Sequence, residues 1–182
     1  MQKTDRHGLL EWSASFLVAF VAVLLVRIFL VSPYVVEGAS MDPTLENGEK
    51  LVVNKVAYLV GTPDLGDIVI IQDETTHKHY VKRVVGLPGD TIEVINDQLF
   101  VNGKPIKEPY LNRNKERAHK VGMALTGNVP PQEIPEGKVF VMGDNRLKSM
   151  DSRNGLGLID VSMIVGRTEL VVFPFEKIRD VD

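Results

Sequence analysis

The longest apolar run, residues 12–31, is the feature that most constrains how this chain folds. It reads WSASFLVAFVAVLLVRIFLV, and Arg27 is its one charge. A helix of this length crosses a hydrocarbon core of roughly 30 Å. Arg27 lies near the far end, where its long stem lets the guanidinium reach the interface. The run is longer than the apolar core of a secretory signal, and no small-residue cleavage site follows it directly. We predict a transmembrane anchor at 12–31, preceded by a short tail at 1–11.

The charges around this run give a weak preference for its orientation. Lys3 and Arg6 favour a cytoplasmic N-terminus, whereas Asp5 lies between them and Arg27 favours the opposite orientation. We predict a cytoplasmic N-terminus, which leaves residues 32–182 on the extracytoplasmic side.

Short β-rich runs fill the rest of the chain, so we predict one mainly β domain with antiparallel sheets. The expected strands are KLVVN, DIVIIQ, HYVKRVVG, DTIEVI, LFVNGKPI, KVFVMGD and IVGRTELVVFPF. Asn102-Gly103 is a hairpin signal because both residues tolerate positive φ. No comparably long amphipathic helix is expected. The polar stretch from Lys107 to Gly137 loses periodicity and ends among prolines, which predicts an irregular surface excursion.

Charge and composition exclude several function classes. The net charge of −3 provides no basic field for a phosphate backbone, so we predict no nucleic-acid partner. The sequence contains no cysteine, which excludes disulfides, thiol nucleophiles and thiolate metal sites. Covalent catalysis would therefore need another side chain.

Ser40, in the stretch GASMDPTL, is the first candidate nucleophile. A serine between Gly38 and Pro43 most often caps its own loop backbone, and this is the default interpretation of Ser40 alone. A serine nucleophile needs a base within hydrogen-bond reach, because its hydroxyl is hardly ionised near neutral pH.

The four histidines are weak candidates for that base. His7 precedes the anchor, and His77, His79 and His119 lie in strongly polar stretches. Alternation along a strand would project His77 and His79 to the same side, where Asp73 could join them on a metal ion. Two histidines without a further distinctive ligand are a weak signal for a metal. We predict neither a Ser-His-Asp triad nor a metal or other cofactor.

Lys82 is the remaining base. In HYVKRVVGLPGD, alternation sends Lys82 to one face with Tyr80 and Arg83 to the other face. Burial against apolar neighbours can lower the pKa of an amine from about 10.4 by the roughly 2 to 4 units that a base near neutral pH needs. The competing interpretation is a surface strand lysine. Arg83 cannot act as a base, because guanidinium stays protonated.

A third polar stretch, MGDNRLKSMDSRNGLG at residues 142–157, follows a predicted strand. Such a cluster is often a loop with internal hydrogen bonds. Alternatively, it positions other groups: Asp151 and Arg153 can pair, and a serine hydroxyl can orient a lysine amine.

These stretches, in this order behind an anchor, resemble the type I signal peptidases. SMDPTL resembles the nucleophile box of that family, KRVVGLPGD its base box and GDNRLKSMDSR its third box, and LGDIVI resembles a Gly-Asp-Ile-Val strand. The resemblance runs from about Val36 to Arg167. It implies a fold of two coiled β-sheets and a small enzyme of the Gram-positive type.

The resemblance also implies roles for individual residues. Ser40 is expected to attack the scissile carbonyl, Lys82 to act as general base, and the Ser40 backbone N–H to stabilise the oxyanion. Ser149 is expected to orient the Lys82 amine. The residues expected to hold the loop geometry are Asp144, Arg146, Asp151 and Arg153.

The family implies an endopeptidase of the plasma membrane. Its expected partners are the signal peptides of exported preproteins, cut after small residues at −1 and −3, together with the lipid bilayer and, in passing, the secretion translocase. Gly38 departs from family members that carry a second, serine oxyanion donor there, and Lys148 stands where asparagine is common. Two other interpretations remain open: an inactive anchored binding or assembly module, and a self-cleaving or regulatory serine-lysine protease.

Overall fold

The computed structural model describes residues 12–13, 15–21, 31–73 and 75–181. Of the predicted anchor, the described residues 12, 13 and 15–21 are helical, and Val31 is the first residue of a strand. The remainder of the predicted anchor and the tail at 1–11 lie outside the described residues. Within the described ranges, no helix has both the length and the apolar character needed to cross a membrane.

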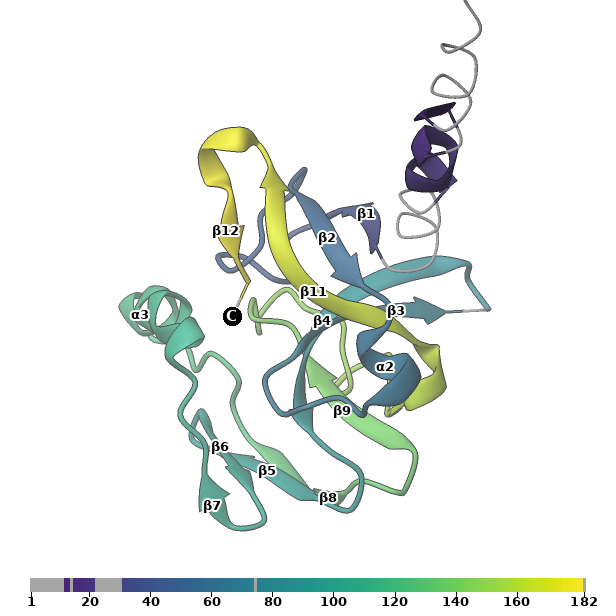
Figure 1. Ribbon diagram of the computed structural model, residues 1–182. Helices are drawn as coiled ribbons and strands as arrows, with labels where there is room; N and C mark the ends of the chain where they lie inside the picture. The colour runs from purple at the N-terminus through teal and green to yellow at the C-terminus, as the bar shows by residue number, and fades with distance from the viewer. Residues whose placement is uncertain (1–11, 14, 22–30, 74, 182) are drawn as a thin grey trace, which may run out of the picture.

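Two antiparallel sheets form the body, which confirms the predicted mainly β, antiparallel architecture (Figure 1). The larger sheet runs in the order β1 (Val31–Val35), β2 (Lys50–Asn54), β11 (Ile164–Phe173), β3 (Ile68–Asp73), β4 (Lys78–Gly86), β9 (Lys138–Met142) and β10 (Ile159–Asp160), and β12 (Arg179–Asp180) pairs with β11. The smaller sheet has the order β7 (Lys104–Pro105), β6 (Gln98–Val101), β5 (Thr91–Ile95) and β8 (Val129–Glu133). All seven predicted runs form strands. Asn102 and Gly103, at φ 52° and 72°, turn the predicted hairpin between β6 and β7.

The larger sheet is strongly curled. β1 and β4 are separated in the sheet by three strands, yet the ring of Tyr34 on β1 lies 5.4 Å from the ring of His79 on β4. Alternating side chains, such as Leu51 and Val53 on β2, fill the inside of this curl. A second apolar cluster around Phe140 and Ile92 joins the smaller sheet to β9.

The predicted irregular excursion at residues 107–137 is wrong in detail, because this segment holds regular structure. It contains the short 3₁₀ helix η1 (Pro109–Leu111), the helix α3 (Asn112–Lys120) and the strand β8. The other short helices are α2 (Ala57–Val60), η2 (Val161–Met163) and η3 (Phe175–Lys177). β8 accommodates two prolines because it is an edge strand, where a missing N–H breaks no ladder.

Candidate active site

Ser40 lies in the loop that joins β1 to β2. The apolar neighbours of Ser40 fix this loop, since Met41 and Leu45 are buried in the core of the curled sheet. Backbone hydrogen bonds also close the base of the loop, from Val36 N to Glu49 O and from Gly48 N to Val36 O, both at 2.8 Å. The half-buried Ser40 is therefore held on a loop that is anchored on both sides.

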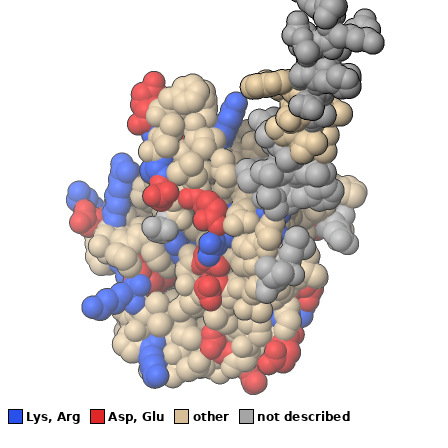
Figure 2. Space-filling view, in the orientation of Figure 1, with Lys and Arg blue, Asp and Glu red and all other residues tan. Residues whose placement is uncertain are grey.

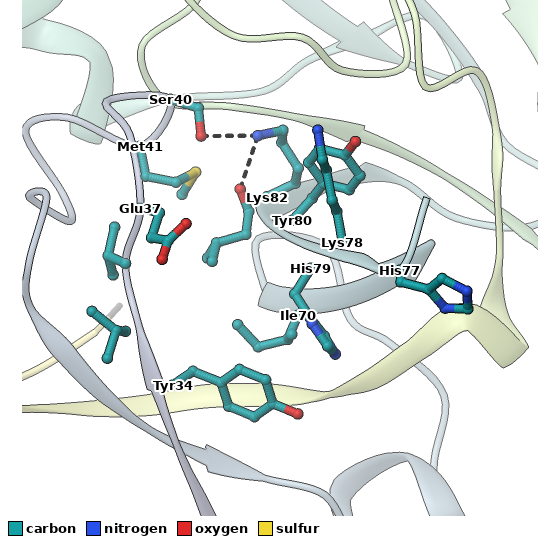
Figure 3. A pocket seen from close by; sticks show the side chains of 13 residues that line it. Tyr34, Glu37, Ser40, Met41, Ile70, His77, Lys78, His79, Tyr80 and Lys82 are labelled. Atoms are coloured by element: carbon teal, nitrogen blue, oxygen red, sulfur yellow. Dashed lines mark hydrogen bonds between the residues drawn. The ribbon is translucent and has the colours of Figure 1, made fainter. Parts of the chain in front are cut away.

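Lys82 projects from β4 towards Ser40. Its Nζ atom donates hydrogen bonds to Ser40 Oγ at 2.9 Å and to the Val81 carbonyl at 3.1 Å (Figure 3). Only 2% of Lys82 is exposed, and this burial lowers the pKa of its amine to about 8, although the carboxylates of Asp151 and Asp144 oppose the shift. A substantial fraction of an amine with this pKa is neutral near pH 8, so Lys82 can accept a proton.

Arg83 points away from Ser40, as strand alternation predicts. Its guanidinium binds the carboxylate of Asp144 through two nitrogens, at 3.0 and 2.9 Å, and the Gly66 carbonyl at 2.8 Å. Asp144 also accepts a 2.5 Å hydrogen bond from Thr44, four residues after Ser40. Asp144 therefore ties β4 to the loop that carries the serine.

The loop after β9 is held by two ion pairs, which involve the predicted supporting residues Arg146, Asp151 and Arg153. Arg153 binds both carboxylate oxygens of Asp151 at 2.8 Å, and the Gly143 N–H donates to the same carboxylate. Burial alone would raise the pKa of Asp151, but these bonds hold it below its ordinary value. Arg146 forms a fully buried pair with Glu108, which lies in the segment before α3.

Ser149 lies in the same loop with its hydroxyl buried. Among the described residues, Ser149 Oγ forms no hydrogen bond of regular geometry, although Ser149 helps to lower the pKa of the neighbouring Asp151 carboxyl. A Cβ atom on Gly143 would come within 2.3 Å of Ser149 Oγ and 2.4 Å of the Ser40 carbonyl oxygen. Only glycine fits between the two serines at this distance. The predicted contact between Ser149 and the Lys82 amine is not formed in this structure, so this role of Ser149 stays a prediction.

The histidines lie away from the serine hydroxyl. His77 and His79 line a cavity beside Ser40 and Lys82, and the ring of His79 packs against the ring of Tyr34 (Figure 3). His119 lies on the exposed side of α3, and His7 falls outside the described residues. In the part of the chain that the structure describes, no three His, Asp or Glu side chains gather in a group able to hold a metal ion.

A cavity of about 570 Å³ opens beside the Ser40 and Lys82 side chains. The residues Tyr34 to Glu37 form one wall, and the residues His77 to Lys82 form the other. One edge of β4 pairs with β3. Its other edge pairs with β9 only from Arg83 onward, so before Arg83 this edge has no strand partner among the described residues. In the described residues, β1 likewise pairs with a strand on one edge only. Both walls thus offer unpaired strand edges to the cavity.

Two asparagines contact the Ser40 loop but were not predicted to do so. Asn145 donates its backbone N–H to Ser40 O and its side-chain amide to Ala39 O, both at 2.9 Å. The sequence signal that could have indicated this contact is the position of Asn145 next to Asp144, within the third box. Asn114 on α3 donates to the carbonyls of Asp42 and Asp144. The sequence around Asn114 offered no signal for such a contact.

A serine hydroxyl beside a buried amine on a β-sheet scaffold is an arrangement found in serine peptidases. The sequence matches the family model described as "Signal peptidase, peptidase S26" over residues 9–173. The chain therefore belongs to this family, and its activity is that of a signal peptidase I.

Individual relatives agree with this assignment. The chain is 54% identical over 178 residues to "Signal peptidase I T" of Bacillus subtilis (strain 168), covering 98% of this chain and 91% of the relative. It is 52% identical over 177 residues to "Signal peptidase I" of Bacillus licheniformis, covering 97% and 95%. Its fold is similar to the crystal structure of a signal peptidase I from Enterococcus faecalis V583. That match has a TM-score of 0.54 and 31% identity, and it covers 59% of this chain and 97% of the other.

Proposed function

We propose that the chain is a membrane-anchored endopeptidase that removes N-terminal signal peptides from exported preproteins, with Ser40 as nucleophile and Lys82 as general base. The observation that carries this proposal is the 2.9 Å hydrogen bond between Lys82 Nζ and Ser40 Oγ at the side of the cavity. Burial keeps the pKa of Lys82 at about 8, so a substantial fraction of the amine is neutral near pH 8.

The reaction proceeds in two acyl transfers. Ser40 Oγ attacks the scissile carbonyl carbon while its proton passes to the neutral Lys82 amine. The resulting ammonium then donates that proton to the leaving amine, and the mature protein departs. Lys82, neutral again, takes a proton from water, which attacks the Ser40 ester and releases the signal peptide. Lys82 finally returns the proton to Ser40.

The Ser40 backbone N–H is the proposed donor to the oxyanion. Its peptide plane is supported by neighbouring hydrogen bonds, because Ser40 O accepts from Asn145 N and Ala39 O accepts from the Asn145 side chain. The N–H of Gly38 is occupied by Asn47 Oδ1 at 2.9 Å, so it is not available to an oxyanion. We propose that the buried hydroxyl of Ser149 pairs with the Lys82 amine during the reaction, because this hydroxyl forms no hydrogen bond of regular geometry in the structure.

An extended peptide suits the cavity beside the dyad. The unpaired edges of β1 and β4 can each accept a peptide strand through backbone hydrogen bonds. Side chains of a strand alternate, so the residues at −1 and −3 face the same wall. Buried or half-buried apolar groups line the cavity at Val36, Met41, Ile70 and Val81. Small residues at −1 and −3 fit such shallow apolar sites.

The proposed anchor at residues 12–31 leads directly into β1, a strand of the larger sheet. About eight residues separate the end of the anchor from Ser40, which keeps the active site close to the bilayer. We propose a single-pass protein of the plasma membrane with the body, residues 32–182, on the extracytoplasmic side. On the extracytoplasmic side of the membrane the body would meet signal peptides as they leave the secretion translocase.

Preprotein cleavage by detergent-solubilised full-length protein tests the dyad. The wild type is compared with Ser40→Ala and Lys82→Met, and both variants are expected to lose cleavage while they keep the wild-type melting temperature. Cleavage by Lys82→Met at the wild-type rate would exclude Lys82 as the base. No cleavage by folded wild type would favour the inactive binding module.

A further inference from the structure

We propose that Asn114 on α3 is a positioning residue that holds the Ser40 loop in register with Lys82. This inference rests on the proposed dyad. It assigns a role to the segment before β8, which lies outside the four stretches that resemble the family.

Asn114 is 5% exposed, and its side-chain amide bridges two loops. Its Nδ2 atom donates to the Asp42 carbonyl at 2.7 Å and to the Asp144 carbonyl at 3.0 Å. Asp42 follows Ser40 by two residues. The amide therefore uses both of its N–H donors to connect the nucleophile loop with the loop that follows β9.

These contacts close a ring around the dyad. From Ser40 the ring passes through the Asp42 carbonyl and Asn114 to Asp144, whose carboxylate binds Arg83. Arg83 is the next residue after Lys82, and Lys82 Nζ returns to Ser40 Oγ. Movement of the nucleophile loop away from β4 thus requires the loss of at least one contact of this ring, and Asn114 supplies two of its hydrogen bonds.

The segment around Asn114 is itself firmly attached beside the active site. Tyr110 lies with its ring 3.9 Å from the guanidinium of Arg83, and Glu108 pairs with Arg146. Leu111, Ala118 and Leu125 bury the inner side of α3. This scaffold gives the Asn114 amide a fixed position from which it can act on the Ser40 loop.

Arg117, one turn further along α3, supports the same bridge from the surface. Its Nη1 atom lies 3.2 Å from the carboxylate of Asp42 and donates to Asn114 Oδ1 at 3.4 Å. Arg113, Glu116 and Lys120 of α3 are exposed, and Lys and Arg side chains project from the side of the molecule where α3 lies (Figure 2). Glu116 is one of these exposed residues, which makes it a matched control on the same helix.

Steady-state cleavage by full-length Asn114→Ala, Asn114→Asp and Glu116→Ala tests the proposal. Misplacement of a nucleophile by a fraction of an ångström is expected to lower kcat about tenfold or more. Asn114 is not among the residues that line the peptide cavity, so KM should stay within about twofold of the wild-type value. Asn114→Asp keeps the side-chain volume but presents an acceptor to two carbonyls, and should lose at least as much activity. Glu116→Ala should cleave like the wild type.

The result that overturns the proposal is a kcat for Asn114→Ala, per folded molecule, within twofold of wild type, even if the melting temperature falls. If neither Asn114 variant folds, Arg117→Gln decides: kcat about threefold lower at unchanged KM supports the proposal, and unchanged kcat refutes it. Ser40→Ala is assayed in parallel. If Ser40→Ala still cuts, the dyad fails; if only Ser40→Ala is inactive, the positioning role alone fails.

Discussion

The amine of Lys82 lies 2.9 Å from the hydroxyl of Ser40, although 42 positions separate the two residues in the chain. The serine comes from the loop between β1 and β2 and the lysine from β4, so the curl of the sheet brings them together. The same burial that surrounds Lys82 lowers the pKa of its amine to about 8. The fold therefore supplies both the distance and the basicity that a general base needs.

Lys82→Arg should abolish cleavage as thoroughly as Lys82→Met. The guanidinium keeps a positive charge near Ser40 but stays protonated, so it cannot accept the proton of the hydroxyl. We expect preprotein cleavage to fall by roughly 10³-fold or more. Lys138→Arg, on an exposed pair with Asp160, is the control for the substitution itself. Retention of a tenth of wild-type activity by Lys82→Arg would argue against proton transfer to Lys82.

Asp144→Asn should shift the pH dependence of cleavage to lower pH. The carboxylate of Asp144 stabilises the charged Lys82 amine, which raises the pKa of that amine. Its removal, with Arg83 left unpaired nearby, lowers this pKa further below its ordinary value. The pH of half-maximal kcat/KM should therefore fall below that of the wild type. A shift to higher pH would contradict this electrostatic account.

The same substitution should destabilise the fold. Asp144 and Arg83 form a buried pair, with side-chain exposures of 0% and 4%. Breaking such a pair from one side costs roughly 3 kcal/mol of unfolding free energy. Denaturant unfolding of Asp144→Asn beside the wild type measures this loss, and an unchanged free energy of unfolding would contradict it.

Gly143→Ala should disrupt the site through steric contact alone. The new methyl group would lie 2.3 Å from Ser149 Oγ and 2.4 Å from Ser40 O, so the two loops must separate. We expect at least about a hundredfold loss of cleavage, because the Ser40 loop moves relative to Lys82. Leu147→Ala, at an exposed position of the same loop, is the control. Wild-type kinetics for Gly143→Ala would mean that the two loops are not held at this distance in solution.

A pair of substitutions at Gly38 tests whether the site lacks a side-chain oxyanion donor. Gly38 has φ +87°, and a Cβ there would meet no atom within 4 Å. Ser and Ala at this position carry the same backbone strain, so the ratio of their rates isolates the hydroxyl. We expect Gly38→Ser to cleave about tenfold faster than Gly38→Ala. Equal rates would mean that no oxyanion lies within reach of this position.

The strands were predictable because they depend on local patterns. Alternation in β4 separates Lys82 from Arg83, and the Asn102-Gly103 hairpin needs only two residues of suitable conformation. The pairing of Ser40 with Lys82 was a different case. It followed from the resemblance of the boxes, since either residue alone had a structural explanation.

Helix α3 and its contacts were not predictable from periodicity. The helix buries only Asn114 and Ala118, so no apolar stripe marks it in the sequence. Its stability depends on packing by Leu111 and Leu125, which lie beyond its ends. The role of Asn114 depends on two backbone carbonyls far away in the chain, and a backbone carbonyl has no sequence signature.

The pH dependence of single-turnover preprotein cleavage by the wild type tests the dyad most directly. The rate constant of the chemical step should rise about tenfold per pH unit below the pKa of Lys82, which is about 8, and level off above it. In the proposed dyad neutral Lys82 is the active form, so the rate is expected to follow the fraction of deprotonated amine. A rate that stays flat from pH 5 to pH 9 would contradict a titrating lysine base.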